Sequence, residues 1–366
     1  MTVRYIYSEF DDAFFEKLKA LQSLMSVFNY ILLQVGGDVE QALKAMERLR
    51  DLGYLPEDFD PDEFRRQLEK DGVIKAEQSG AAILTRKGER NLRKDAFEYV
   101  FGNLRNSGPG GHQTRFSGGE SEEILPEKRR FGFGDEMRHL DITGSLFNSI
   151  SRSGSLGMEL DESDLEVYDT SKTTSAATVI LIDISHSMIL YGEDRITPAK
   201  QVAMAFTEMI KTKYPKDSLN IVTFGNDAKE VRIEDLPYLS VGPFLTNTKA
   251  GLQMARNILL RKKNANKQIF MITDGKPSMI KRRNGSTYQN PMGLDPMIVN
   301  RTLDEAVVCR KKKIPITTFM IAEDKYLQQF VMKLTELNKG RAYFASPQDL
   351  GNYVFMDFLS NRRKQG

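Results

Sequence analysis

The sequence predicts an α/β protein with a doubly wound parallel sheet in its C-terminal half and a mainly helical region before it. Short apolar runs, such as Ala177 to Ile182 and Gln268 to Ile272, have the length and composition of buried strands. Segments with helical spacing of apolar residues stand between these runs, and this alternation is typical of a parallel sheet covered on both faces. A chain of 366 residues is long enough for two domains.

Residues 1–104 are predicted to form an N-terminal helical domain. Within residues 11–34, apolar residues recur in steps of four and three, which is the spacing of one helix face. A second helix is expected over residues 38–52, between Asp38 and Gly53. A third is expected to start at Asp60-Pro61 and to run towards Leu68, with Asp71-Gly72 ending it.

Two short strands, residues 73–76 and 81–84, and a helix over residues 85–104 are expected to complete this domain. Helices followed by a hairpin and a further helix suggest a winged-helix-like unit. The last helix is basic, as a DNA-binding helix would be, and its basic residues are Arg86, Lys87, Arg90, Arg93 and Lys94. A solvated helix face is the alternative that we favour, because the sequence shows no dimer signature and no second basic arm.

Residues 105–174 are predicted to be a linker and an extension. Residues 106–120 are rich in glycine and serine and are expected to form a flexible connection. They are no phosphate loop, because the Walker lysine is missing and no strand leads into them. A short helix is expected from Asp141 through Ile150, before an acidic stretch at residues 161–169. We expect residues 120–170 to pack on or near the C-terminal domain.

The C-terminal domain is predicted over residues 175–361, with helices on both faces of its sheet because parallel crossovers are right-handed. The predicted strands are residues 177–184, 218–224, an edge strand near 229–233, 268–273, 315–321 and 341–345. The predicted helices are residues 196–213, 247–261, 296–313, 325–338 and 349–361.

Polar residues occupy alternate positions after the first of these strands, at Asp183, Ser185 and Ser187. Open parallel sheets bind ligands at the carboxyl ends of their strands. Carboxylate and hydroxyl oxygens are the ligands that a hard cation such as Mg²⁺ accepts, and no cluster of histidine and cysteine favours zinc. Taken alone, these three residues could equally cap the next helix or hold a turn.

Two further segments strengthen the metal hypothesis. Thr246 opens a helical pattern, and Asp274, within Thr273-Asp274-Gly275, ends another buried strand. The order D-x-S-x-S, then T, then T-D-G resembles the von Willebrand factor A (VWA) domain, whose fold is a Rossmann-like parallel sheet. In that family the matching positions form the metal-ion-dependent adhesion site, and here they are Asp183, Ser185, Ser187, Thr246 and Asp274. The resemblance implies direct ligation by the two serine hydroxyls, and ligation by the threonine directly in one state and through water in another. Both aspartates are then expected to act mainly through waters or serine hydroxyls.

The resemblance also implies a function. The bound ion, Mg²⁺ with Ca²⁺ or Mn²⁺ as alternatives, keeps one coordination place open for an Asp or Glu of a protein partner. A VWA domain behind a helical extension is similar to bacterial cytoplasmic proteins that work with MoxR-type AAA+ ATPases, among them CoxE-like proteins and the D subunit of magnesium chelatase. The pattern "fGD…D…T…N…R" within residues 120–170 resembles the stretch before the VWA domain in some of these proteins. A chaperone-like adaptor that couples such an ATPase to a client is expected.

The segment from Lys276 to Pro296 is the candidate for partner specificity. It follows Asp274, it is long for a strand-to-helix connection, and its residues Lys281, Arg282 and Arg283 could attract an acidic partner. The alternative is a mobile, solvated insertion.

Composition and motifs exclude several function classes. With 52 basic and 50 acidic residues, the net charge of +2 argues against attraction of the whole protein to nucleic acid, so a nucleic-acid-binding regulator ranks second. The single cysteine, Cys309, excludes an intramolecular disulfide. The sequence shows no apolar signal region and no apolar run of membrane-spanning length. We therefore expect a cytoplasmic protein without membrane partners.

The sequence also argues against an enzyme. Ser185 stands where a haloacid-dehalogenase-type phosphatase needs a second aspartate. A serine hydrolase needs a G-x-S-x-G turn and a histidine base, which are missing. The Walker A motif is also missing, so any ATPase activity is expected to come from a partner.

Overall fold

The computed structural model divides the chain into two compact units. The first unit comprises Met1–Gln113 with Ala176–Ser360, and the second comprises Thr114–Ser175 with Asn361–Gly366. The residues described are 23–56, 58–77, 81–104, 122–132, 140–154, 160–172, 175–192, 194–242, 245–274, 276–282, 284–290, 293–321, 324–347 and 349–363. The predicted start of the first helix at residue 11 and the glycine-rich residues 106–119 lie outside the described residues.

A six-stranded sheet forms the centre of the first unit, with the strand order β12-β11-β8-β5-β6-β7. The strands are β5 (Ala176–Asp183), β6 (Ser218–Phe224), β7 (Ala228–Val231), β8 (Asn266–Thr273), β11 (Ile316–Met320) and β12 (Arg341–Phe344). All neighbours are parallel except β7, which is antiparallel to β6. Every residue of β5 is buried, because β6 and β8 flank it and helices cover both faces. The predicted α/β fold class is confirmed.

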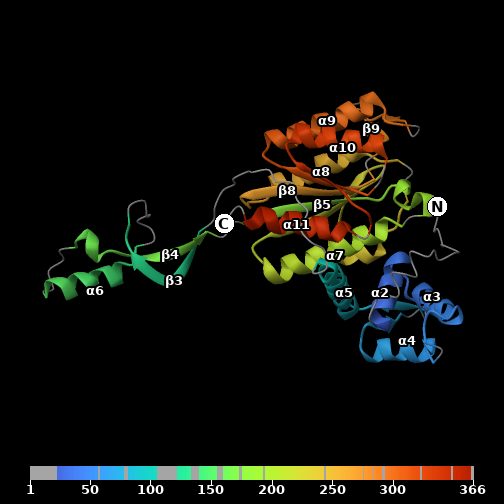
Figure 1. Cartoon of the computed structure of the whole chain (residues 1–366), viewed down its shortest axis with the longest axis horizontal. Helices are drawn as coiled ribbons and strands as arrows, with labels where there is room; N and C mark the ends of the chain where they lie inside the picture. Colours follow the sequence, from blue (N-terminus) through green and yellow to red (C-terminus); the bar gives the residue numbers. More distant parts are fainter. Residues whose placement is uncertain are drawn as a thin grey trace. The chain divides into compact units, whose positions relative to one another are not determined.

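Helices cover the two faces of this sheet (Figure 1). Helices α8 (Thr248–Leu260), α9 (Pro296–Lys311) and α10 (Lys325–Asn338) share one apolar core with alternate residues of the central strands, including Val179 and Leu181. Helices α7 (Ile196–Lys213) and α11 (Leu350–Arg363) share the other core with the intervening residues, including Ile180 and Ile182. Side chains alternate between the faces of a strand, so both faces of β5 are apolar.

The N-terminal region packs against α7 on the side away from the sheet. Its elements are α2 (Leu24–Gln34), α3 (Val39–Asp51), α4 (Pro61–Lys70), β1 (Ile74–Ala76), β2 (Ala82–Leu84) and α5 (Arg86–Leu104). Because the sheet lies on one side and α5 on the other, α7 is buried without interruption from Ile196 to Ile210. Arg93 Nε of α5 lies 3.6 Å from Glu208 Oε2 of α7.

Buried residues of the N-terminal region, between Val27 and Val100, and of the C-terminal region, between Ile180 and Phe358, therefore share one hydrophobic core within one compact unit. The three-part division of the chain, with residues 1–104 as a domain that folds by itself, stays a prediction.

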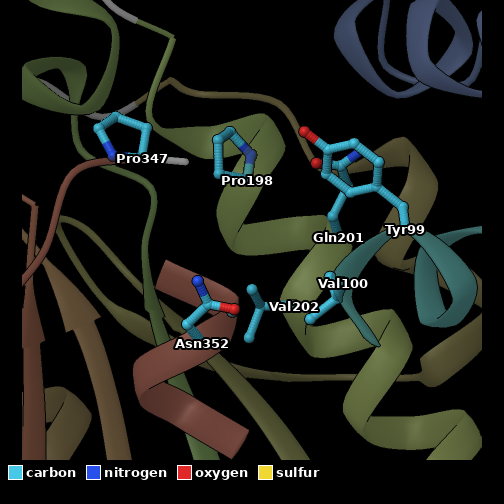
Figure 2. A pocket seen from close by; sticks show the side chains of 8 residues that line it. Tyr99, Val100, Pro198, Gln201, Val202, Pro347 and Asn352 are labelled. Atoms are coloured by element: carbon cyan, nitrogen blue, oxygen red, sulfur yellow. The ribbon is translucent and has the colours of Figure 1, made fainter. Parts of the chain in front are cut away.

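Helices α5, α7 and α11 meet closely, and Figure 2 shows the small cavity between them. The cavity has a volume of ≈ 20 Å³, enough for about one water molecule. A Cβ atom at Gly351 of α11 would lie 2.5 Å from Cγ1 of Val100 of α5, so glycine permits this approach. Asn352 lines the cavity, and its buried Oδ1 has no hydrogen-bond partner in the described part of the chain.

The second unit pairs strands β3 (Glu122–Arg130) and β4 (Glu166–Lys172) antiparallel, with α6 (Ile142–Ser153) and the short 3₁₀ helix η2 (Glu162–Asp164) between them. The helix after Asp141 agrees with the prediction, whereas the two strands were not predicted. Charged residues interrupt the apolar alternation of β3, and Pro126 falls where its register shifts between Ile124 and Lys128. No helix among the described residues of either unit is long and apolar enough to cross a membrane.

Candidate metal centre

The first candidate segment begins at the carboxyl end of β5. Asp183 is fully buried, and its Oδ1 accepts a hydrogen bond from Ser185 N (2.9 Å) while its Oδ2 accepts one from Thr273 Oγ1 (2.7 Å). The chain then turns into the 3₁₀ helix η3 (His186–Gly192), which brings Ser187 beside Ser185 with their Oγ atoms 3.0 Å apart. Three oxygen-bearing side chains thus gather in one turn, and both carboxylate oxygens of Asp183 are held in place.

Asp274 follows the neighbouring strand β8. The parallel register pairs Ile182 with Ile272, so both strands end at the same edge of the sheet. Asp274 is 3 % exposed, and its Oδ1 accepts a long hydrogen bond from Lys276 N (3.3 Å). Burial and then the negative charge of Asp274 raise the pKa of Asp183 to about 7. The two carboxyl groups are therefore close enough to repel each other when both are ionised.

Thr246 lies in the loop before α8, and this loop is tied to the same edge. Asn247 N donates to the carbonyl of Gly225 (2.7 Å), which directly follows β6. Ser278 holds Thr246 from both sides, because its Oγ accepts from Thr246 N (2.8 Å) and its own N–H donates to Thr246 O (2.9 Å). Thr246 is 3 % exposed, and its hydroxyl forms no hydrogen bond to another described residue.

Sequence reasoning missed Ser278. No local pattern marks this serine, because its role depends on a contact with a loop that lies far away in the sequence. The structure links the Thr246 loop to the segment after Asp274 mainly through this buried residue, and Met279 N adds a longer hydrogen bond to Thr246 O (3.3 Å).

Over its described residues, the segment from Lys276 to Pro296 forms a hairpin that is packed at its start and exposed from Lys281 through most of its length. Its role in partner specificity stays a prediction. Strands β9 (Met279–Lys281) and β10 (Thr287–Gln289) pair antiparallel, and Met279 and Ile280 are buried. Lys281 forms an ion pair with Asp227, and the guanidinium of Arg282 lies 4.7 Å from the ring centre of Tyr288. Arg283 lies outside the described residues.

The donor set fits a hard divalent cation. The carboxylates of Asp183 and Asp274 are buried, and neither forms an ion pair with a lysine, arginine or histidine that the structure describes. Two buried carboxylates without a cation are costly, and a divalent ion bound by carboxylate and hydroxyl oxygens would compensate them. No group of three or more His, Cys, Asp or Glu that could hold a metal occurs among the described residues, so hydroxyl oxygens are needed for the set.

Comparison with known proteins identifies the family. Residues 176–359 match the model of the vWA domain of Rv0959-like proteins, and residues 123–170 match the model of the third domain of these proteins. The chain belongs to the Rv0959-like family of vWA-domain proteins. This confirms the VWA resemblance of the C-terminal half, while the metal-ion-dependent adhesion site and the ATPase partner stay predictions. The match to the third domain covers residues 123–170, which lie within the second unit.

The relatives themselves are uncharacterized. This Rv0959-like chain is 27 % identical over 310 residues to the uncharacterized protein Rv0959 of Mycobacterium tuberculosis and, with the same values, to the uncharacterized protein Mb0984 of Mycobacterium bovis. Each alignment covers 82 % of this chain and 45 % of the relative. The chain thus spans about half the length of the curated relatives that it matches.

Solved structures show a looser likeness. The pilus adhesin SpaC of Lactobacillus rhamnosus GG has a TM-score of 0.43 at 14 % identity, over 52 % of this chain and 30 % of that one. The vWF domain of the pilus tip protein Mfa5 of Porphyromonas gingivalis has a TM-score of 0.43 at 16 % identity, over 54 % and 98 %. BatB of Bacteroides thetaiotaomicron has a TM-score of 0.38 at 13 % identity, over 52 % and 100 %. At these values none of the three supports an inference about function.

Proposed function

We propose that the vWA domain of this chain is a metal-dependent protein-interaction module. The observation that carries the proposal is the pair of buried carboxylates, Asp183 and Asp274, at the ends of neighbouring strands. No described lysine, arginine or histidine forms an ion pair with either carboxylate. The hydroxyls of Ser185, Ser187 and Thr246 lie in the same three segments. The proposed ion is Mg²⁺, with Ca²⁺ or Mn²⁺ as alternatives.

In this proposal the aspartates provide negative charge and the hydroxyl residues provide coordinating oxygens. Asp183 and Asp274 supply the negative charge that attracts the ion, and hydrogen bonds to both oxygens of Asp183 keep that carboxylate oriented. Ser185 and Ser187 supply neutral oxygens from one short turn, and Thr246 supplies a third hydroxyl from a loop held by Ser278. When bound, the ion supplies an electron-poor centre that a carboxylate of a partner protein can approach.

The proposed partner is a MoxR-type AAA+ ATPase, and the proposed role is that of an adaptor between this ATPase and a client protein. Its support is the resemblance to VWA proteins with a helical extension, together with the missing Walker A motif in the sequence. The partner would present an Asp or Glu to the metal, and the hairpin of β9 and β10 would lie beside this contact.

Calorimetry with millimolar Mg²⁺ tests the site directly. The wild type should bind Mg²⁺ weakly and reversibly, since Mg²⁺ gives up its water reluctantly, while Asp183→Ala should bind little. Asp227→Ala is the matched control, because Asp227 is exposed and pairs with Lys281 instead. Equal binding by the wild type and by Asp183→Ala would contradict the site.

A capture experiment from the native cell extract tests the partner. The wild type should retain an ATPase identified by mass spectrometry, and EDTA or Ser185→Ala should release it. A variant with Lys281, Arg282 and Arg283 all changed to Ala should retain less of it. Capture that is unaffected by EDTA and by Ser185→Ala would show that no metal bridges the two proteins.

A nucleic-acid-binding role for the N-terminal region is the second candidate. Four basic side chains on α5, those of Arg86, Lys87, Arg90 and Lys94, are exposed, whereas Arg93 faces Glu208. Acidic residues also lie close to this helix: burial raises the pKa of Glu89, and the nearby charges of Glu234 and Asp235 add to this rise. A DNA mobility shift that weakens steeply with salt would favour this role, and no shift at low salt would exclude it.

A further inference from the structure

The two serines of the candidate metal centre belong to a segment that continues directly into α7. Both follow β5, Ser187 lies in η3, and the chain enters α7 at Ile196. The hydroxyl oxygens of Ser185 and Ser187 are hydrogen-bonded at 3.0 Å. Neighbouring ligand oxygens of an octahedral Mg²⁺ are also about 3.0 Å apart when each bond is about 2.1 Å long. The turn as it stands therefore gives the two serines the spacing that a shared ion needs.

Hydrogen bonds fix this turn to the start of α7. Met188 N donates to Ser185 O (3.0 Å), and Arg195 N donates to Met188 O (3.0 Å). The side chain of Met188 is fully buried and belongs to the core that the N-terminal region shares with α7. Asp194 precedes α7, and its Oδ1 accepts from Thr197 N in the first turn of the helix (3.0 Å). A shift of the start of α7 would therefore displace the turn that carries the serines.

The last turn of α2 binds the start of α7. Lys200 Nζ of α7 donates to Leu33 O (2.9 Å) and to Pro237 O (3.4 Å). The residue after Leu33, Gln34, donates through Nε2 to Asp194 Oδ2 (3.5 Å). The end of α2 thus contacts α7 both just before its first residue and one turn into the helix, at the point to which the serine turn is tied.

This contact buries a charge, which makes its release accessible. Lys200 is 2 % exposed, and its hydrogen bonds to Leu33 and Pro237 end on neutral carbonyl oxygens. Neutral oxygens compensate a buried ammonium less well than a carboxylate does. The burial of this charge therefore opposes the docking of α2, so local opening of the end of α2 provides a second state.

We propose that the N-terminal region regulates the metal affinity of the vWA domain through the docking of α2 on α7. This inference rests on the proposed function, because it needs the metal centre. In the docked state Ser185 and Ser187 have the spacing of metal ligands, so docking favours the bound ion and release of α2 disfavours it. Linkage makes the effect reciprocal, so bound Mg²⁺ should hold the end of α2 on α7. A partner that displaces α2 would thereby weaken the metal centre.

The variant Gln34→Glu tests the effect of docking on the metal. It places a second carboxylate beside Asp194 Oδ2, and repulsion between the two should favour the released state. Calorimetry of the full chain with Mg²⁺ should then give a dissociation constant about tenfold higher than that of the wild type. Gln41→Glu is the matched control, because Gln41 Nε2 also donates to an aspartate, Asp38 Oδ2 (2.8 Å), but this pair lies at the start of α3.

Hydrogen exchange of the wild type tests the reciprocal effect without a substitution. Saturating Mg²⁺, compared with EDTA, should slow the exchange of the backbone amides of residues 33–37 by up to about tenfold, since linkage gives both effects the same factor. The amides of α3 and α4 should exchange at the same rates in both conditions. This measurement decides the proposal even where Gln34→Glu fails to fold, as circular dichroism would show.

The outcomes separate this inference from the proposed function. Mg²⁺ binding by the wild type with equal or tighter binding by Gln34→Glu would overturn the regulation and leave the metal centre in place. Unchanged exchange at residues 33–37 in a wild type that binds Mg²⁺ would do the same, and so would an equal loss of affinity in Gln41→Glu. A wild type that binds no Mg²⁺ would overturn the metal centre and the regulation together.

Discussion

Lys200 offers the sharpest test of how the N-terminal region is joined to the vWA domain. The side chain is 2 % exposed within α7, and its Nζ donates to Leu33 O at the end of α2 (2.9 Å) and to Pro237 O of the 3₁₀ helix η4 (Ile233–Tyr238) (3.4 Å). Burial lowers the pKa of Lys200 from 10.5 to about 8, and the nearby charge of Asp194 opposes this effect. A buried ammonium thus joins three segments of the first unit.

The pH dependence of stability follows from this pKa. Below pH 8 the amine is protonated in the folded and unfolded chains, so the cost of burying its charge is fully present. Between pH 8 and 10.5 the folded chain binds fewer protons than the unfolded chain, so the free energy of unfolding rises with pH. The difference between the two pKa values corresponds to about 3 kcal/mol.

The variant Lys200→Met removes the titrating group and keeps a side chain of similar length. Urea unfolding at about pH 7.5 and about pH 10.5 then compares both proteins across the range in which Lys200 titrates. The stability of the wild type relative to Lys200→Met should rise by about 3 kcal/mol between these two pH values. Other titrating groups are common to both proteins and cancel in this difference. A stability difference that is the same at both pH values would refute the assignment of a buried, titrating amine to Lys200.

Four further outcomes are expected. Ser278→Ala should weaken Mg²⁺ binding about tenfold in calorimetry because it releases the Thr246 loop, while Ser278→Thr should bind like the wild type; an unchanged affinity in Ser278→Ala would count against this role. Asp183→Asn should raise the melting temperature in EDTA, because one of two neighbouring buried carboxylates is neutralised, and should abolish the stabilisation by Mg²⁺; lower stability in EDTA would argue against repulsion with Asp274. Gly351→Ala should lower the free energy of unfolding by about 2 kcal/mol, because the added methyl group meets Val100; a change within error in urea unfolding would show that α5 and α11 can separate there. Limited proteolysis should cut first within residues 106–119, because stretches of small residues are preferred targets; first cuts elsewhere would move the domain boundary.

Local patterns in the sequence were sufficient for most elements of the vWA domain. The predicted bounds of α7, β6 and α10 agree with the structure residue for residue. These elements have strong periodicity or continuous apolar runs, and both properties arise within one segment. The five candidate metal ligands could be predicted for the same reason, because each of them lies at the end of a strand, just after it, or at the start of a helix.

The sequence of α7 itself indicates that a further segment packs on this helix. The segment from Ile196 to Ile210 is apolar around most of its circumference, and a helix that is apolar all round is buried on more than one side. The sequence indicates in this way that something covers the outer side of α7. It does not indicate that α5 does so, because contacts between distant segments have no local periodicity.

The sequence by itself determined the fold class, the vWA resemblance and the identity of the candidate metal ligands, because strand length, helix spacing and polar strand ends are local properties. The tertiary structure alone determined the hydrogen bonds between Ser278 and Thr246, the burial of Lys200 and the exposure of the apolar side chains of α6. Each of these depends on which segments meet in space. In α6 the sequence pattern even suggests the opposite orientation. The hydrogen bonds to Asp164 and Glu166 override this pattern, because a buried carboxylate or hydroxyl without a partner costs more than apolar side chains left in water.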